Sequence, residues 1–70
     1  MEYRAHFFRH ITDSLRPVYS VNVQGETTSD ARNAALLLLP NVRDAVGFRL
    51  CDRTDRQVDI YVPPEHLNDL

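Results

Sequence analysis

Histidine and cysteine are the side chains of this chain best suited to binding a transition metal. The sequence contains three histidines and one cysteine, namely His6, His10, His66 and Cys51. On a β-strand, His6 and His10 would lie about 13 Å apart, too far to share a zinc ion whose Zn–N bonds are about 2 Å. On a helix they would lie one turn apart and could share one, but no paired Cys or His motif supplies the remaining ligands. The sequence therefore predicts no metal site and no cofactor.

Nucleophilic catalysis by this chain would depend on Cys51. A cysteine nucleophile needs a neighbouring histidine to take up its proton, and no motif in the sequence places one there. The two glycines, Gly25 and Gly47, are isolated, so the chain has no glycine-rich loop for phosphate. A chain of 70 residues also has little room for a concave substrate pocket. We therefore predict that the protein is not an enzyme and has no catalytic residue.

Aromatic and basic side chains are predicted to share one face of a β-sheet. Alternation along the strands places six of them there, namely Arg4, His6, Phe8, His10, Arg49 and Tyr61. Rings on such a face stack on the bases of single-stranded nucleic acid, and arginines meet its phosphates. Asp59 on the same predicted face and a formal net charge of −2 weaken the basic field. An ordinary solvated face is the alternative, so nucleic-acid binding is kept as the second function hypothesis.

The clearest helix in the sequence spans residues 27–40. Thr27 and Asp30 resemble a capping box, with Asp in place of the usual Glu. Alanine and leucine then propagate the helix at little entropic cost, and Pro40 ends it.

The apolar surface of this helix is wider than packing against one layer requires. One stripe at helical spacing is predicted to face the core, and it consists of Ala31, Ala34, Ala35 and Leu38. Leu36 and Leu37 point elsewhere, on the side that carries Arg32 and Asn33 one turn earlier. Either the C-terminal segment covers these two leucines or they contact a partner, because large exposed apolar patches are rare on monomers. We expect Leu36 and Leu37 to form a partner interface with a second copy of the chain or with another protein.

Two strands are predicted before the helix. Residues 2–11 are rich in aromatic side chains and alternate with a period of two, which favours a strand, but a helix with an equally regular apolar stripe stays open as the alternative. Residues 12–17 contain Asp, Ser and Pro and are predicted to form a turn. Residues 18–24 alternate Tyr and Val with Ser, Asn and Gln, as a half-buried strand does.

A second hairpin is predicted after the helix. Its strands lie within residues 44–52 and 57–62, and a polar loop at residues 52–56 joins them. Three side chains of the last strand are expected to face the helix and two to face away, the first set being Val58, Ile60 and Val62 and the second Asp59 and Tyr61.

These elements predict an α+β fold. We expect a two-layer β-β-α-β-β arrangement, with the helix packed on one face of the sheet and a short C-terminal helix at residues 64–68. The chain has room for a single domain, residues 1–70. A core of this size gives marginal stability, which oligomers often supplement.

The leading function hypothesis is a small non-enzymatic protein-interaction module. Its partner would be a second copy of the chain in a homodimer, or a larger complex in which it serves as an accessory or inhibitory subunit. No apolar segment follows Met1, so we expect no signal peptide. The longest apolar run, residues 34–39, is far shorter than the roughly 20 residues of a membrane span. We therefore expect a cytoplasmic protein without a membrane partner.

Overall fold

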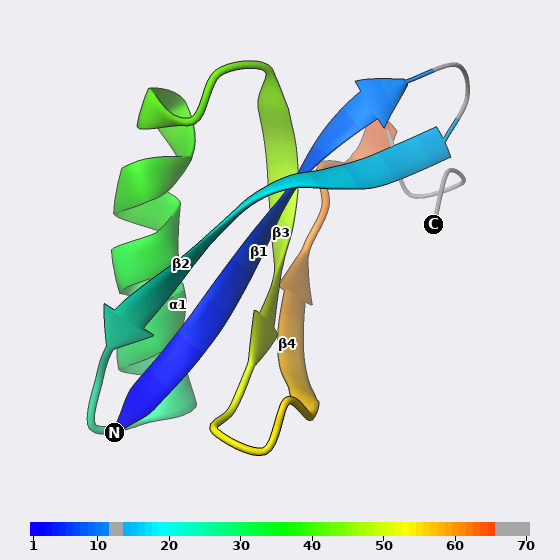
Figure 1. The fold of residues 1–70 in the computed structure, drawn as a ribbon. Helices are drawn as coiled ribbons and strands as arrows, with labels where there is room; N and C mark the ends of the chain where they lie inside the picture. The colour runs from blue at the N-terminus through cyan, green and yellow to red at the C-terminus, as the bar shows by residue number, and fades with distance from the viewer. Residues whose placement is uncertain (12–13, 66–70) are drawn as a thin grey trace.

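The computed structural model shows a four-stranded antiparallel sheet with one helix on one face (Figure 1). It describes residues 1–11 and 14–65, and for residue 11 it describes the backbone alone. The elements in chain order are β1 (Glu2–Ile11), β2 (Ser14–Gln24), α1 (Thr28–Leu38), the 3₁₀ turn η1 (Leu39–Asn41), β3 (Ala45–Cys51) and β4 (Gln57–Tyr61). The predicted α+β class is confirmed, and the first segment is a strand rather than a helix.

β1 lies at the centre of the sheet, whose strand order is β2-β1-β3-β4. It pairs antiparallel with β2 on one side and with β3 on the other. β2 and β3 therefore run parallel to each other, and α1 connects them by crossing over β1 (Figure 1). Parallel strands need a long connection of this kind, so the helix follows from the strand order.

The core joins small residues of the helix to aromatic residues of the sheet. Ala31 and Ala35 are fully buried, as are Phe7 of β1 and Phe48 of β3, and all four belong to one cluster. The rings of Phe7 and Phe48 lie 5.7 Å apart at an angle of 57°. Because alanine carries only a methyl group, the helix backbone approaches the sheet closely and the two rings fill the layer between them. The predicted apolar stripe of the helix is therefore confirmed.

The helix begins as the sequence predicts and ends in a tighter turn. Thr27 is the N-cap, and its hydroxyl accepts a hydrogen bond from the backbone N–H of Asp30 at 3.2 Å. Pro40 lies within η1, where its fixed φ and missing N–H suit the first residues of a helical turn.

β2 begins at Ser14 rather than at Val18, so the turn predicted over residues 12–17 is wrong for residues 14–17, and residues 12–13 lie outside the described residues. Pro17 is compatible with this strand because β2 is an outer strand of the described sheet, where it pairs with β1. The pairing with β1 skips Val18, which marks a β-bulge. The alternation of apolar and polar side chains breaks at such a bulge. For that reason the alternating pattern in the sequence predicted a strand that begins only at Val18.

β4 presents the opposite faces from those predicted. Tyr61 is paired with Phe48 and Asp59 with Leu50, and paired residues of antiparallel strands project to the same side. Tyr61 and Asp59 therefore lie on the helix side, with the Tyr61 ring stacked 5.7 Å from that of Phe48. Ile60, which is paired with Arg49, lies on the other face, and the register skips Val58, which marks an irregularity in the strand. Alternation along an outer strand does not say which of its faces meets the helix.

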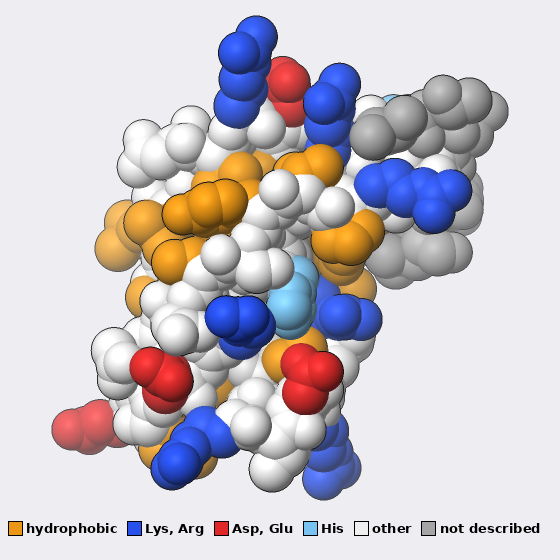
Figure 2. Space-filling view, viewed as in Figure 1, with side chains coloured by type: hydrophobic (Ala, Val, Ile, Leu, Met, Phe, Trp, Pro, Cys, Tyr) orange, Lys and Arg blue, Asp and Glu red, His pale blue; other side chains and the backbone are white. Residues whose placement is uncertain are grey.

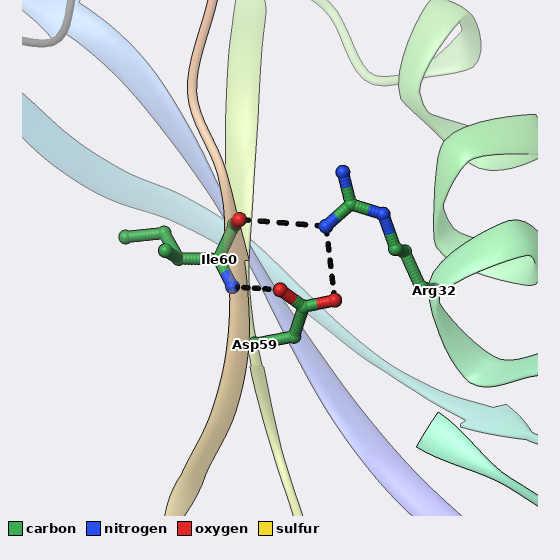
Figure 3. A network of polar contacts seen from close by, with 3 residues as sticks. All are labelled: Arg32, Asp59 and Ile60. Atoms are coloured by element: carbon green, nitrogen blue, oxygen red, sulfur yellow. Dashed lines mark hydrogen bonds and ion pairs between the residues drawn. The ribbon is translucent and has the colours of Figure 1, made fainter. Parts of the chain in front are cut away.

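A polar contact with the helix accounts for the observed face of β4 (Figure 3). Nη1 of Arg32 donates to Oδ2 of Asp59 at 2.9 Å and to the carbonyl of Ile60 at 3.5 Å. The other carboxylate oxygen of Asp59 accepts the N–H of Ile60 at 2.8 Å. The guanidinium carbon of Arg32 also lies 5.6 Å from the centre of the Tyr61 ring. Asp59 is thus half-buried with both oxygens bonded, which removes most of the cost of its desolvation.

The predicted C-terminal helix at residues 64–68 falls mostly outside the described residues. Pro64 and Glu65 have 3₁₀ geometry, and the description ends there, so His66 is outside it. Within residues 1–11 and 14–65 there is no C-terminal helix. Over the same ranges, no helix combines the length and the apolar character that a membrane crossing needs.

Gly47 offers a test of the packing between β3 and β4. A Cβ atom at this position would lie 2.2 Å from the backbone oxygen of Tyr61, which cannot rotate away. We expect Gly47→Ala to lower the free energy of unfolding by about 1–3 kcal/mol, as overpacking does. Urea unfolding followed by circular dichroism measures this, with Val58→Ala on exposed surface as the control. Equal stability of Gly47→Ala and the wild type would contradict the described approach of the two strands.

The contact between Arg32 and Asp59 can be measured by a double-mutant cycle. We expect Arg32→Met and Asp59→Asn to show a coupling free energy of about 0.5–1 kcal/mol in unfolding, because the pair is partly shielded from water. The matched control is the exposed pair of Arg43 and Asp44, whose atoms are 3.9 Å apart, and there we expect no measurable coupling. The same coupling in both pairs would contradict the assigned geometry.

Candidate functional site

The two leucines predicted to form a partner interface lie in different environments. Leu37 is 78% exposed. Leu36 is half-buried and packs against the core cluster. It follows Arg32 by one helical turn, on the side of α1 that faces β4. Leu37 is therefore the member of the pair available to a partner, whereas Leu36 contributes to the core.

An apolar groove opens between the end of α1 and the middle of β2. It has a volume of about 460 Å³ and is lined by Val18, Tyr19, Val21, Leu38, Asn41, Val42 and Arg43. Val18 is 45% exposed and Tyr19 is 51% exposed. Figure 2 shows hydrophobic side chains gathered over this part of the helix and of β2. We refer to it below as the α1–β2 groove.

The sequence analysis missed this groove because it depends on the bulge in β2. Val18 and Tyr19 are consecutive, and in a regular strand consecutive side chains point to opposite faces. At the bulge both of them line the groove. The adjacent apolar pair was the signal in the sequence, but alternation alone assigned Val18 to the start of a regular strand.

Among the residues that the structure describes, β2 also leaves one edge of the sheet unpaired. It is an outer strand of 11 residues, longer than the outer strand β4 at the opposite edge. An unpaired edge presents backbone N–H and C=O groups to any chain that can pair with it. Pro17 lacks an N–H, and the bulge at Val18 interrupts the register, so regular pairing is available from Tyr19 to Gln24.

The sheet face opposite the helix brings together His6, Cys51 and Asp55. One ring nitrogen, the thiol sulfur and one carboxylate oxygen all lie within 4.8 Å of one another. Cys51 is paired with Arg4 in the β1–β3 register, which puts His6 at the neighbouring diagonal position on the same face. We refer to these three side chains as the His6 cluster. The sequence analysis compared His6 only with His10, since the pairing that brings Cys51 to it joins strands far apart in the chain.

The hairpin between β3 and β4 holds Asp55 in place. Oδ1 of Asp52 accepts hydrogen bonds from the N–H and hydroxyl of Thr54 and from the N–H of Arg56, at 2.9, 2.6 and 3.1 Å. These bonds, that of the Thr54 hydroxyl first, lower the pKa of Asp52. Asp55 itself has a φ of 66°, a left-handed conformation that Asp and Asn adopt more readily than most residues. The loop is thus organised by a carboxylate that stays ionised.

His6 is held on one side and unpartnered on the other. Its Nδ1 lies 2.7 Å from the hydroxyl oxygen of Ser20. Its Nε2 is buried and has no hydrogen-bond partner in the described part of the chain. Burial lowers the pKa of His6, and the positive charge of Arg49 lowers it further, while Asp55 opposes both. The ring therefore favours its neutral form, in which one nitrogen keeps a lone pair.

Covalent catalysis does not fit this arrangement. A cysteine nucleophile must be reached by the carbonyl or phosphoryl group that it attacks. Cys51 is 1% exposed and lies under its neighbours on the sheet. A ring nitrogen, a sulfur and a carboxylate oxygen converging on one point suit an ion better than a substrate.

The predicted nucleic-acid face is assembled only in part. Arg4, Phe8 and Arg49 lie with His6 on the sheet face opposite the helix, whereas Tyr61 lies on the helix side, so its place in the prediction is wrong. Phe8 is half-buried, and Nε of Arg4 donates to Asn22 at 3.3 Å. His10 is exposed four positions further along β1. In Figure 2 a histidine (pale blue) is visible among arginine and acidic side chains, so both signs of charge share this view.

Comparison with known proteins identifies no family for this chain. No family model matches it, and neither a curated protein nor a solved structure does. Its function is therefore argued from the geometry of the groove and of the His6 cluster.

The lowered pKa of His6 makes stability depend on pH. A histidine whose pKa is lower in the folded than in the unfolded protein contributes stability that is present above about pH 6.5 and is lost as the pH falls through the folded value. We expect an NMR titration of the metal-free protein, with chelator, to give His6 a pKa below that of the urea-unfolded chain.

Arg49→Gln should raise the pKa of His6, because it removes a nearby positive charge. The control is Arg16→Gln on exposed β2 surface, which should leave the titration unchanged. A folded pKa at or above the unfolded value would contradict the described burial of the ring.

Proposed function

We propose that this chain is a small protein-interaction module without catalytic activity of its own, and that its partner binds in the α1–β2 groove. The observation that supports this is the coincidence of an apolar groove with an unpaired strand edge on the same element, β2. A partner that adds a strand there gains backbone hydrogen bonds, and its side chains reach the groove.

The exposed apolar side chains supply a driving force for association. Val18, Tyr19 and Leu37 are 45%, 51% and 78% exposed. Burying an apolar side chain completely contributes about 1.5–3 kcal/mol, of which the part still exposed here is available to a complex. Association itself costs several kcal/mol in lost translational and rotational freedom. The groove needs the added hydrogen bonds of the β2 edge to overcome that cost.

A second copy of the chain is the occupant that we propose. Two β2 strands pairing antiparallel about a two-fold axis would place the same surface of each copy in one continuous interface. Pairing along residues 19–24 avoids both Pro17 and the bulge. An eight-stranded sheet across two copies would also enlarge the small core that one copy provides. A different protein that uses the chain as an accessory or inhibitory subunit is the alternative occupant.

Charge substitutions at two exposed apolar side chains test this proposal: Val18 lines the groove, and Leu37 directly precedes the groove residue Leu38. We expect Val18→Glu and Leu37→Glu to weaken the dimer by about 10–100-fold, because each buries a carboxylate in an apolar contact. Both side chains are exposed in the single chain, so neither substitution should unfold it. Size exclusion with light scattering over a concentration series measures the association, and circular dichroism checks the fold.

The matched control is Val58→Glu, since Val58 is 37% exposed on β4 at the opposite edge of the sheet. It should leave the association unchanged. A wild-type chain that stays monomeric at every concentration would exclude the homodimer. Pull-downs with wild-type and Leu37→Glu chains as bait would then test for a different partner.

Single-stranded nucleic-acid binding is the alternative function, and the structure offers it less support. With Tyr61 on the helix side, the one aromatic side chain left from the predicted set is Phe8, which is half-buried. Base stacking on a sheet uses several exposed rings. No observation on the described residues favours this function over the interaction module.

A further inference from the structure

We propose that the His6 cluster is a binding site for a divalent transition-metal ion of the zinc class. The ligands are Nε2 of His6, the sulfur of Cys51 and a carboxylate oxygen of Asp55, which come from β1, β3 and the β3–β4 hairpin. Imidazole, thiolate and carboxylate are the donors found in zinc sites. The harder ions Mg²⁺ and Ca²⁺ prefer oxygen donors alone, so this set selects against them.

The spacing of the three donor atoms fits such an ion after a small adjustment. They lie within 4.8 Å of one another. In a tetrahedral site with bonds of about 2.0–2.3 Å, donor atoms are about 3.3–3.7 Å apart. The cluster therefore has to contract by about 1 Å, which is within reach of a side-chain rotation at Asp55 in the exposed hairpin.

His6 is prepared for the role of ligand on both sides of its ring. Nε2 is buried and has no hydrogen-bond partner among the residues described, a cost that a bound ion would remove. Nδ1 lies 2.7 Å from the hydroxyl oxygen of Ser20. Metal at Nε2 selects the tautomer in which Nδ1–H donates to that oxygen, and such an outer hydrogen bond fixes the ring in most protein metal sites. Ser20 is thus a positioning residue.

The charges around the cluster balance when the ion is bound. The thiolate of Cys51 and the carboxylate of Asp55 together cancel the two positive charges of the ion. Arg49 and Arg4 lie close enough to act on the charge of His6, and they would repel a bare cation. They face a neutral group once both anionic ligands are engaged. Binding should release the thiol proton, because a coordinated thiol is deprotonated.

The three side chains of the His6 cluster do not complete the coordination of a tetrahedral ion. Three protein ligands leave one tetrahedral position for water or for a donor from another molecule. A polar depression of about 500 Å³, lined in part by Arg4, Asn22 and Asp55, opens beside the cluster. The ion would tie two strands and a hairpin together, and it would stabilise the folded chain by binding it in preference to the unfolded chain.

Cobalt substitution tests the site on the chain of residues 1–70. Co²⁺ added to reduced, metal-free protein should bind at one ion per chain and give a sulfur-to-cobalt charge-transfer band in the near ultraviolet. Cys51→Ser should abolish that band. Zn²⁺ should displace the cobalt and raise the melting temperature of the wild type.

Three further variants separate ligands from neighbours. Asp55→Asn keeps the left-handed turn, because Asn adopts that conformation as readily as Asp, and it should weaken Zn²⁺ binding by more than about tenfold. Ser20→Ala should weaken it by about tenfold while leaving the sulfur-to-cobalt band in place. The control is His10→Gln on the same strand, which should bind as the wild type does.

Two results would overturn the proposal. One is a wild-type chain that does not bind Co²⁺ or Zn²⁺ at stoichiometric concentration. The other is binding that survives both Cys51→Ser and Asp55→Asn with unchanged affinity, which would place the ion elsewhere on the chain. Circular dichroism of each variant confirms that it is folded, and Asp55→Asn, on an exposed loop, keeps the test decisive should Cys51→Ser fail to fold.

Discussion

The pairing of β1 with β3 is the constraint on which the rest of this structure depends. It joins the hairpin before the helix to the hairpin after it, and it makes β1 the central strand. On one side of the sheet it puts Phe7 against Phe48 beneath the helix. On the other side it brings Cys51 next to His6. The core and the proposed metal site therefore lie on opposite faces of the sheet and depend on the same β1–β3 register. A shift of that register by one residue would abolish both.

The sequence predicted the elements of this fold better than the faces that they present. The Thr27 cap and the buried Ala31 and Ala35 follow from local rules of capping and periodicity, and these rules held. Tyr61 was assigned to the wrong face because an outer strand, half-covered on both sides, has no wholly apolar side to reveal its orientation. Its orientation depends on Arg32, a helix residue 27 positions from Asp59. No local pattern contains that contact.

The candidate sites were harder to predict for a related reason. The α1–β2 groove needs a bulge at Val18, and the His6 cluster needs a cross-strand neighbour of Cys51; both follow from strand pairing rather than from spacing along one segment. The exposure of Leu37 could be predicted from the sequence, because a leucine outside the core-facing stripe of the helix departs from the amphipathic pattern by itself. The partial burial of Leu36 could not be predicted, since it depends on the position of the helix relative to β4.

The burial of Cys51 also bears on how copies of this chain can be joined. Cys51 is the single cysteine in the sequence, and its side chain is 1% exposed. A disulfide between two copies needs the two sulfurs about 2 Å apart, so the β3–β4 region of each chain would have to open first. The association through β2 that we propose would consequently be non-covalent and insensitive to reductants. A disulfide-linked pair on a non-reducing gel would instead indicate chains that had opened or misfolded, so the oxidation state of Cys51 distinguishes folded from unfolded chains.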